Sequence, residues 1–355
     1  MTHIVTKAGD DFRLPAYARD RNFQILYLGD VPLQSGKTLY DTRLAFKTYG
    51  ELNAASDNCI VFPTHYTGTH WSNEGLIGPG RALDPGKYFI VVPNLFGNGL
   101  SSSPSNTPSP HGGSRFPRVT IYDNVLCQHR LVMEYLAVRR VALVTGWSVG
   151  ALQAYQWATL FPDQVERLLP FCGSARCWPM NYVFLEGVKA ALLADASYCK
   201  GCYQRPPEAG LRAFGHAYAG WAYSPAFFRD ALYTKLGFAS LEDFLLFWEQ
   251  DHLEWDANDL LAKLWTWQHA DPSANPVYSG DFRRALASIK ARTIVMPCDT
   301  DRYFTLEENE IEARLIPAAE LHPLRSPFGH CAGAPGRFRD ETAFLERALR
   351  DLLAR

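Results

Sequence analysis

A serine flanked by glycines stands near the middle of the chain, in the segment Gly-Trp-Ser-Val-Gly at 146–150. The apolar run 141–144 precedes it, and a helical pattern of residues follows directly. A sharp strand-to-helix turn of this kind exposes the serine hydroxyl above the edge of a sheet, where it can attack an acyl carbon. N–H groups at the start of the helix favour the negative charge that develops there. We therefore interpret Ser148 as a nucleophile; an ordinary glycine-bearing turn is the alternative.

A serine hydroxyl is a poor nucleophile at neutral pH, so it needs a histidine base and a carboxylate that orients the base. In the fold that carries this turn, the chain order is serine, acid, histidine. Asp299 and Asp301 both follow the late apolar run 294–297, and position alone leaves both open as the acid. His330 lies in a Gly-His-x-x-Gly loop before a C-terminal helical pattern, and we predict that it is the base, with His322 as the alternative.

Backbone N–H groups must hold the oxyanion that forms when a serine attacks an acyl carbonyl. One should belong to Val149, and the other to the loop after an early core strand, which is the place of residues 65–68. His65 and His70 lie close together here, but no third ligand follows at a recognisable spacing. We therefore predict no metal site.

The elements that must position these residues alternate between strands and helices. Helical spacing covers 122–138 and 149–161. This rhythm predicts an α/β fold whose central sheet is mostly parallel and flanked by helices. The loop 94–113 is long and irregular, which is typical of functional or disordered segments. Strands are expected at 23–28, 44–50, 59–63, 88–93, 165–172 and 293–297.

The alternation stops between about residues 175 and 288, where the pattern is helical and rich in aromatic residues. We interpret 175–288 as a helical cap inserted into a core made of 1–174 and 289–355. Most of its aromatic side chains should pack against one another, and a few should line a pocket.

Composition limits the classes of function. The chain has 355 residues, 47% hydrophobic and 20% charged, with a formal net charge of −2. The absence of an extended basic run argues against a nucleic-acid partner, and no apolar stretch has the length that spans a bilayer. Residues 1–15 lack the apolar core of a secretory signal, so we expect a cytoplasmic protein. Cys199 and Cys202 form a lone C-x-x-C pair, which we take as structural or incidental.

Several of these segments resemble the homoserine O-acetyltransferase family of α/β-hydrolase-fold enzymes, and the resemblance covers most of the chain. Thr67-Gly68 matches the end of the family's oxyanion loop, which implies that Tyr66 supplies the second N–H group. Thr-Asp-Arg-Tyr-Phe at 300–304 is similar to the family's acid motif, which favours Asp301. Further matches lie at 44–53, 77–84, 88–89, 128–131 and 329–330.

The departures from the family concern the substrate. The family has a histidine where this chain has Thr64, a different loop at 96–104, and an elbow without Trp147. It also has, after the catalytic histidine, an aspartate implicated in holding the amino group of homoserine, where this chain has Cys331. A neutral thiol cannot neutralise an ammonium group, so the chain looks more like the esterase side branch.

We therefore expect a serine carboxylic ester hydrolase for small, acetyl-type esters, working without cofactor or metal through Ser148, His330 and Asp301. The resemblance and the aromatic cap imply a homodimer. An O-acyltransferase that moves an acetyl group from acetyl-CoA to homoserine or another alcohol is the first alternative. A binding protein that retains the fold without catalysis is the second.

Overall fold

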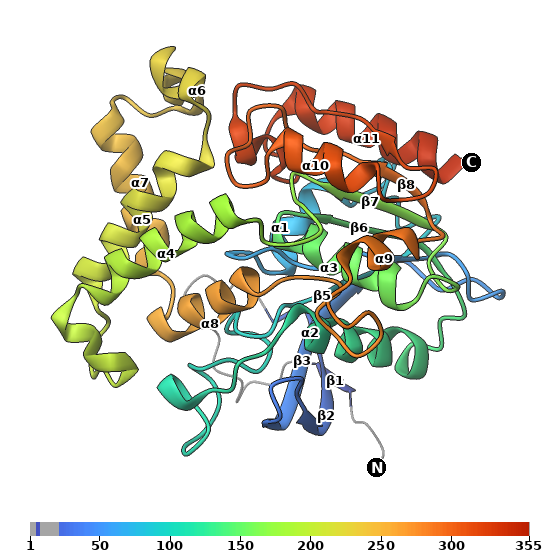
Figure 1. The fold of residues 1–355 in the computed structure, drawn as a ribbon, viewed down its shortest axis with the longest axis horizontal. Helices are drawn as coiled ribbons and strands as arrows, with labels where there is room; N and C mark the ends of the chain where they lie inside the picture. The colour runs from blue at the N-terminus through green and yellow to red at the C-terminus, as the bar shows by residue number, and fades with distance from the viewer. Residues whose placement is uncertain (1–4, 8–20, 355) are drawn as a thin grey trace.

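The computed structural model describes residues 5–7 and 21–354, shown in Figure 1. Most of the segment 1–15, on which the expectation about a secretory signal depends, lies outside these residues. Nine strands form one sheet in the spatial order β1-β2-β3-β5-β4-β6-β7-β8-β9. The strands are β1 (Val5–Lys7), β2 (Gln24–Pro32), β3 (Thr38–Tyr49), β4 (Cys59–Val61), β5 (Phe89–Pro93), β6 (Val141–Trp147), β7 (Arg167–Phe171), β8 (Arg292–Val295) and β9 (Glu320–Leu321).

The sheet is parallel from β5 to β9 and antiparallel at its other end, where β1, β2 and β3 pair in turn and β3 pairs with β5. The central strands β4 and β5 are buried along their whole length, as expected where helices cover both faces of a parallel sheet. The prediction of a mostly parallel α/β sheet is confirmed.

Helices cover both faces of this sheet. Successive residues of β4 belong to different apolar clusters: Val61 shares one cluster with Leu152 of α3 (Val149–Leu160), and Ile60 shares the other with Leu349 of α11 (Arg339–Ala354). This alternation follows from the two-residue period of a strand. The core also contains α1 (His70–Asn73), α2 (Ile121–His129) and α10 (Leu306–Ala313).

The helix expected over 122–138 has two parts. α2 ends at His129, and the chain continues as a π-helical segment, Arg130–Tyr135. The Leu136 N–H donates to the Leu131 carbonyl, five residues earlier, at 2.9 Å. The apolar spacing predicts a helix here, but it does not distinguish this wider turn from an α-helical one.

A group of helices forms a layer beside the core, on the left of Figure 1. α5 packs against both α4 and α7, and α4 also contacts α8. These helices are α4 (Pro179–Leu193), α5 (Glu208–Ala222), α6 (Pro225–Arg229), α7 (Leu241–Leu253) and α8 (Ala257–Gln268). Short 3-10 segments lie at Glu74–Leu76, Gly113–Arg115, Ala196–Gly201, Leu232–Leu236 and Gly329–Gly333.

The chain returns to the core before β8. The Tyr278 hydroxyl donates to the carbonyl of Thr159 in α3 at 2.5 Å, and α9 (Phe282–Ala287) follows. Figure 1 shows α9 next to α3, apart from α4–α8. The division of the chain at 175 and 288 stays a prediction.

Aromatic side chains join the cap helices to the core. Tyr218 of α5 stacks on Tyr66 with ring centroids 6.0 Å apart, and Phe184 of α4 stacks on Tyr303 at 4.7 Å. All four rings belong to one continuous apolar cluster. Some cap aromatics therefore pack against the loops that carry the predicted site, in addition to packing against one another.

In the part of the chain that the structure describes, no helix combines the length and the apolar character needed to cross a membrane.

Candidate active site

Ser148 stands at the turn between β6 and α3, with φ 59° and ψ −125°. A positive φ is strained for a residue that carries a side chain, and such strain is typical of functional turns. Close packing requires the flanking glycines: a Cβ on Gly146 would stand 2.3 Å from the backbone of Gly150, and one on Gly150 would stand 2.7 Å from the carbonyl oxygen of Pro63. The turn has the sharp strand-to-helix geometry in which a nucleophilic serine is found.

The structure brings Ser148, His330 and Asp301 together from three distant segments. His330 Nε2 lies 2.9 Å from Ser148 Oγ, and His330 Nδ1 lies 2.7 Å from Asp301 Oδ2. A carboxylate accepts hydrogen bonds, so we assign the proton to Nδ1, which leaves Nε2 to accept from the serine hydroxyl. All three residues are buried, with 3%, 4% and 5% of their surfaces exposed. The arrangement can take a proton from the serine as the serine attacks.

Backbone hydrogen bonds fix Asp301 in its turn. Its Oδ1 accepts from the N–H of Tyr303 at 2.8 Å and from the N–H of Phe304 at 3.3 Å. Its other oxygen is thereby directed at His330. A carboxylate held in this way can orient the imidazole of a histidine base.

The two alternatives lie elsewhere. Asp299 Oδ1 accepts from the Ser326 N–H at 3.1 Å, and its Oδ2 faces Arg325 Nη1 at 3.4 Å. His322 Nε2 lies 3.0 Å from Glu320 Oε2 in a pair that is partly exposed. Neither residue contacts Ser148 or His330, so the geometry favours Asp301 and His330 over them.

Aromatic rings enclose His330. Trp147 stacks on it with ring centroids 5.2 Å apart, and the Trp147 Nε1–H donates to the His330 carbonyl at 3.2 Å. Tyr303 and Phe304 lie 4.6 Å and 5.5 Å from the same imidazole. The acid turn therefore supplies both the carboxylate and part of the apolar wall around the base.

Two backbone N–H groups next to the site are unused. Val149 is the first residue of α3, and the first N–H groups of a helix have no partner within the helix. Within residues 21–354, the N–H groups of Val149 and Tyr66 have no acceptor. The Tyr66 ring is buried, and its hydroxyl donates to the Leu260 carbonyl of α8 at 2.9 Å. Their assignment to the oxyanion stays a prediction.

The residue after His330 is uncharged. Cys331 is buried, and burial raises the pKa of its thiol to about 11. The Tyr223 phenol interacts with this thiol, and burial raises its pKa as well. Both groups are neutral at physiological pH, so neither compensates for an ammonium group at this place.

The two histidines of the 64–70 loop have separate environments. The His65 ring centroid lies 4.4 Å from that of Trp147, and burial, together with electrostatic interactions with His330 and Lys263, lowers the pKa of His65 to about 3. His70 is buried against Trp71, and its Nδ1 lies 3.2 Å from Asn94 Nδ2. In the described ranges 5–7 and 21–354, no three His, Cys, Asp or Glu side chains are grouped as a metal site would need.

Three residues near the site were not singled out for it from the sequence: Trp147, Tyr303 and Lys263. Trp147 and Tyr303 were visible as neighbours of Ser148 and Asp301 in the chain, but their contacts with His330 depend on the fold. Lys263 lies in the cap helix α8, and its Nζ stands 5.2 Å from the centroid of the Tyr66 ring. No local pattern in the sequence predicts that contact.

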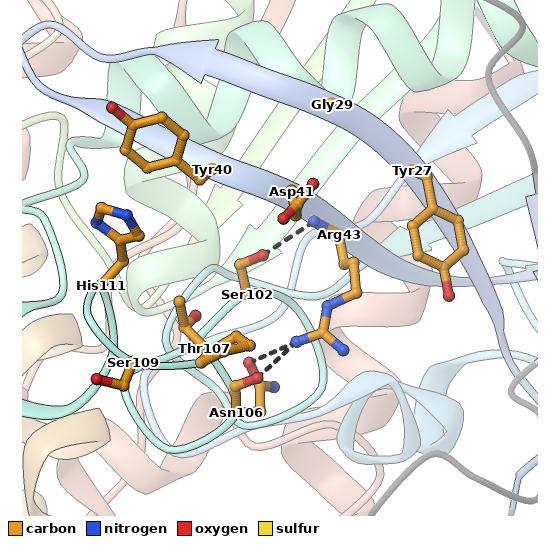
Figure 2. Close-up of a pocket in the computed structure, with 11 residues that line it drawn as sticks. Tyr27, Gly29, Tyr40, Asp41, Arg43, Ser102, Asn106, Thr107, Ser109 and His111 are labelled. Atoms are coloured by element: carbon orange, nitrogen blue, oxygen red, sulfur yellow. Dashed lines mark hydrogen bonds between the residues drawn. The ribbon is translucent and has the colours of Figure 1, made fainter.

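A separate cavity of about 470 Å³ lies between the strands β2 and β3 and the loop that follows β5 (Figure 2). Arg43 crosses it: its N–H donates to Ser102 Oγ at 2.9 Å, and its guanidinium donates to the Asn106 carbonyl at 2.7 Å. The Tyr40 and His111 rings, which also line it, contact each other in a tilted arrangement with ring centroids 4.3 Å apart. None of the predicted site residues lines this cavity.

Cys199 lies in the 3-10 segment after α4 and Cys202 directly follows that segment; both are exposed and both are free. The Cys202 N–H donates to the Cys199 carbonyl at 3.0 Å, so the pair closes a turn. It lies outside the group formed by Ser148, His330 and Asp301.

The chain is similar to known proteins over most of its length. The chain is 38% identical to an ethyl acetate hydrolase from Pseudomonas veronii over 94% of its own length and 95% of the relative's. It is 31% identical to a homoserine O-acetyltransferase from Trichormus variabilis, over 84% of this chain and 86% of that one. The solved structure of the acetyl esterase MekB superposes with a TM-score of 0.91 at 38% identity, over 94% of this chain and 97% of that one.

No protein-family model matches the chain. The matches nevertheless show the family of the chain, because each of the two relatives aligns with it over most of its own length and most of this chain. The superposition with the acetyl esterase structure shows that the fold agrees as well. The chain belongs to the homoserine O-acetyltransferase family of α/β-hydrolase-fold enzymes, in the branch that includes esterases.

Proposed function

We propose that this protein is a serine carboxylic ester hydrolase that cleaves small, acetyl-type esters. The observation that carries the proposal is the buried series of contacts from Asp301 through His330 to Ser148, at 2.7 Å and 2.9 Å. A histidine base held between a carboxylate and a serine hydroxyl is the arrangement that activates serine for acyl transfer. The ethyl acetate hydrolase and the acetyl esterase among the relatives support the choice of a small acetyl ester.

The reaction takes two steps. Ser148 Oγ attacks the acyl carbonyl while His330 Nε2 accepts its proton, and the tetrahedral intermediate collapses when His330 returns that proton to the leaving alcohol. Water then attacks the acyl-enzyme with His330 again as base, which releases the carboxylic acid and restores Ser148. Asp301 keeps the imidazole in the required tautomer. The N–H groups of Val149 and Tyr66 hold the oxyanion in both steps.

The test is the release of acetate from ethyl acetate by the purified protein in plain buffer. Wild-type protein should release acetate and react with a fluorophosphonate probe at Ser148, and Ser148→Ala should do neither. Retention of wild-type ester turnover by Ser148→Ala would refute the proposal. Folded wild-type protein that neither reacts with the probe nor turns over esters would point instead to a binding protein.

Acyl transfer from acetyl-CoA to an alcohol is the second candidate. The alignment with the Trichormus variabilis homoserine O-acetyltransferase favours it, and the neutral pair of Cys331 and Tyr223 argues against homoserine as the acceptor. Parallel reactions with acetyl-CoA, with and without L-homoserine, would be followed by the release of free thiol. We expect no homoserine-dependent release; a rapid one would make transfer the function.

We also propose a homodimer in the cytoplasm. The cap exposes large apolar side chains that a partner would cover, among them Val183 on α4 and Leu246 on α7, which are 68% and 50% exposed. All eight cysteines are free, which suits a reducing compartment. Sedimentation should give twice the chain mass, and Val183→Asp combined with Leu246→Asp should give one chain mass. A monomeric wild-type protein would refute the dimer.

A further inference from the structure

Lys263 is a buried lysine whose ammonium group has no hydrogen-bond acceptor among the described residues. Its Nζ lies over two aromatic rings, 3.7 Å from the centroid of Trp255 and 5.2 Å from the centroid of Tyr66. An ammonium over an aromatic face gains cation–π attraction, which grows when water is excluded. That attraction replaces only part of the hydration that burial removes, so this charge is costly to keep.

The fold makes room for this side chain. Gly97, in the loop after β5, has φ +88°, and a Cβ there would stand 2.9 Å from Lys263 Cγ. A residue with a side chain at position 97 would be strained by its backbone and would also press on the lysine stem. Glycine at position 97 therefore lets the stem of Lys263 pass across the loop toward the rings.

Several charged and titratable groups interact electrostatically with the ammonium, but none of those described forms a hydrogen bond with it. Asp251 and His252 face it from α7, His65 and Tyr66 from the oxyanion loop, and Asp256 and Asp259 from the start of α8. The two carboxylates at the start of α8 already accept other hydrogen bonds. Asp259 accepts from the N–H and the hydroxyl of Ser105 at 2.9 Å and 2.6 Å, and Asp256 accepts from the Tyr203 hydroxyl at 2.7 Å.

The surroundings of Lys263 make its ammonium group easier to deprotonate. Burial lowers the pKa of the Lys263 ammonium well below the usual value for lysine, while the negative charges of Asp259, Asp251 and Asp256 act in the opposite direction. The same burial raises the pKa of Asp259. The charge state of Lys263 is therefore sensitive to pH in a range where an enzyme is assayed.

The ammonium also lies next to the proposed oxyanion loop. Helix α8 holds Tyr66 at two points: Leu260 accepts from its hydroxyl at 2.9 Å, and Lys263 covers its ring. The positive charge of Lys263 also contributes to the lowered pKa of His65, which packs against Trp147 beside His330. Its field thus extends to the group of residues around Ser148.

We infer that Lys263 is a positioning residue for ester cleavage, which holds the Tyr66 ring and places a positive charge next to the residue whose N–H group receives the oxyanion. The inference rests on the proposed hydrolysis at Ser148. A fixed charge aimed at the place where negative charge develops lowers the barrier without taking part in bond making. Burial of an unpaired ammonium lowers the stability of the protein, but it places the charge in the site before the reaction begins.

The test compares Lys263→Met with wild-type protein on ethyl acetate. Methionine keeps the apolar stem without the charge, so kcat should fall about tenfold with little change in KM, the order expected of one unit charge acting through protein. The thermal midpoint should rise, because an unpaired buried charge has been removed. A purely structural lysine would give the opposite midpoint shift.

The pH profile supplies the second readout. Wild-type kcat should decline toward alkaline pH as the ammonium loses its proton, and Lys263→Met should lack this decline. Lys263→Arg keeps its charge at every assay pH, so it should lack the decline and retain more turnover than Lys263→Met. Asp259→Asn is the matched control: it removes a negative neighbour that favours the ammonium, so the decline should remain and move to lower pH.

Two outcomes would overturn the inference. One is a Lys263→Met protein with wild-type kcat and the same alkaline decline. The other is a Lys263→Met protein that unfolds at a lower temperature and loses activity with an unchanged pH profile, which would make the lysine structural. Failure of the proposed function is distinct from both, because wild-type protein would then show no ester turnover and no reaction with the fluorophosphonate probe.

Discussion

Trp147 and His330 lie in parallel contact, with ring centroids 5.2 Å apart and an angle of 22° between the ring planes. The Trp147 Nε1–H also donates to the His330 carbonyl at 3.2 Å. Trp147 occupies the position before the nucleophile, so a single β6 side chain connects the serine turn to the histidine loop. This contact fixes the imidazole plane and the backbone of its loop at the same time.

Replacement of Trp147 should therefore impair catalysis by misplacing the base. We expect Trp147→Ala to lower kcat for ethyl acetate by about tenfold to hundredfold, the effect of a displacement of about 1 Å in the reacting groups. Trp147→Phe keeps a ring against His330 and loses only the Nε1–H bond, so its kcat should stay within about threefold of wild type. Equal turnover by the two variants would show that the stacking does not position His330.

The acid can be identified with two matched variants. Asp301→Asn should lower kcat by about 10³-fold to 10⁴-fold, because an amide does not stabilise the imidazolium and permits the wrong tautomer. Asp299→Asn keeps an oxygen that accepts from the Ser326 N–H and removes only the charge of a partly exposed ion pair with Arg325, so kcat should change by less than about threefold. Steady-state kinetics on ethyl acetate measures both, and a larger loss in Asp299→Asn would reverse the assignment.

The sequence predicts those features of the molecule that depend on neighbouring residues or on the order of the elements along the chain. The glycines around Ser148 and the late position of His330 are visible in the chain, because the turn and the topology impose them. Asp299 and Asp301 could not be separated by position, since both follow the same strand. The direction of each side chain depends on the turn, where two N–H groups bind Asp301 and the Ser326 N–H binds Asp299.

Contacts between segments that are far apart in the chain could not be predicted from the sequence. The cap pattern predicts helices, but helix amphipathicity does not say which aromatic ring meets which core loop. Lys263 is an example: its place over Tyr66 depends on how α8 packs on the core and on the absence of a side chain at Gly97. A buried charge of this kind also opposes the usual preference of lysine for the surface.

The cysteines should divide into two classes in the folded protein. Only Cys199 and Cys202 are exposed, and burial raises the pKa of Cys127, Cys177 and Cys298 to about 12. Since the thiolate is the reactive form, an aromatic disulfide reagent at pH 8 should modify two thiols rapidly in native protein and eight in denaturant. Cys199→Ser combined with Cys202→Ser should remove the rapid phase. Fewer than eight thiols in the denatured chain would reveal a disulfide.

A buried carboxyl group connects α10 to the start of the cap. Glu312 accepts from the Ala175 N–H at 2.8 Å and from the Trp178 Nε1–H at 2.7 Å. Both donors lie where the chain leaves β7 for α4. Burial raises the pKa of Glu312 to about 8, although the two hydrogen bonds and the charge of Arg176 act to lower it.

This carboxyl group should make stability depend on pH. Its folded pKa exceeds the ordinary value of 4.5, so the folded state binds its proton more tightly than the unfolded state does. Its contribution to the free energy of unfolding is therefore complete below about pH 4.5 and is lost as pH rises through about 8, by at most about 1.4 kcal/mol per pH unit. Glu312→Gln has no such proton to lose. Its deficit in stability relative to wild type, caused by an amide that cannot accept both N–H groups, should shrink between pH 5 and pH 8.

Urea unfolding of both proteins at pH 5, 6.5 and 8 measures this difference directly. Glu310→Gln is the matched control, because Glu310 lies on the same helix in an exposed pair with Arg314 and should show no trend of this size. A stability difference between Glu312→Gln and wild type that is constant from pH 5 to pH 8 would mean that Glu312 is already ionised in the folded protein. Its two N–H donors would then outweigh its burial, and the cap would be held to α10 by a charged anchor at every pH in that range.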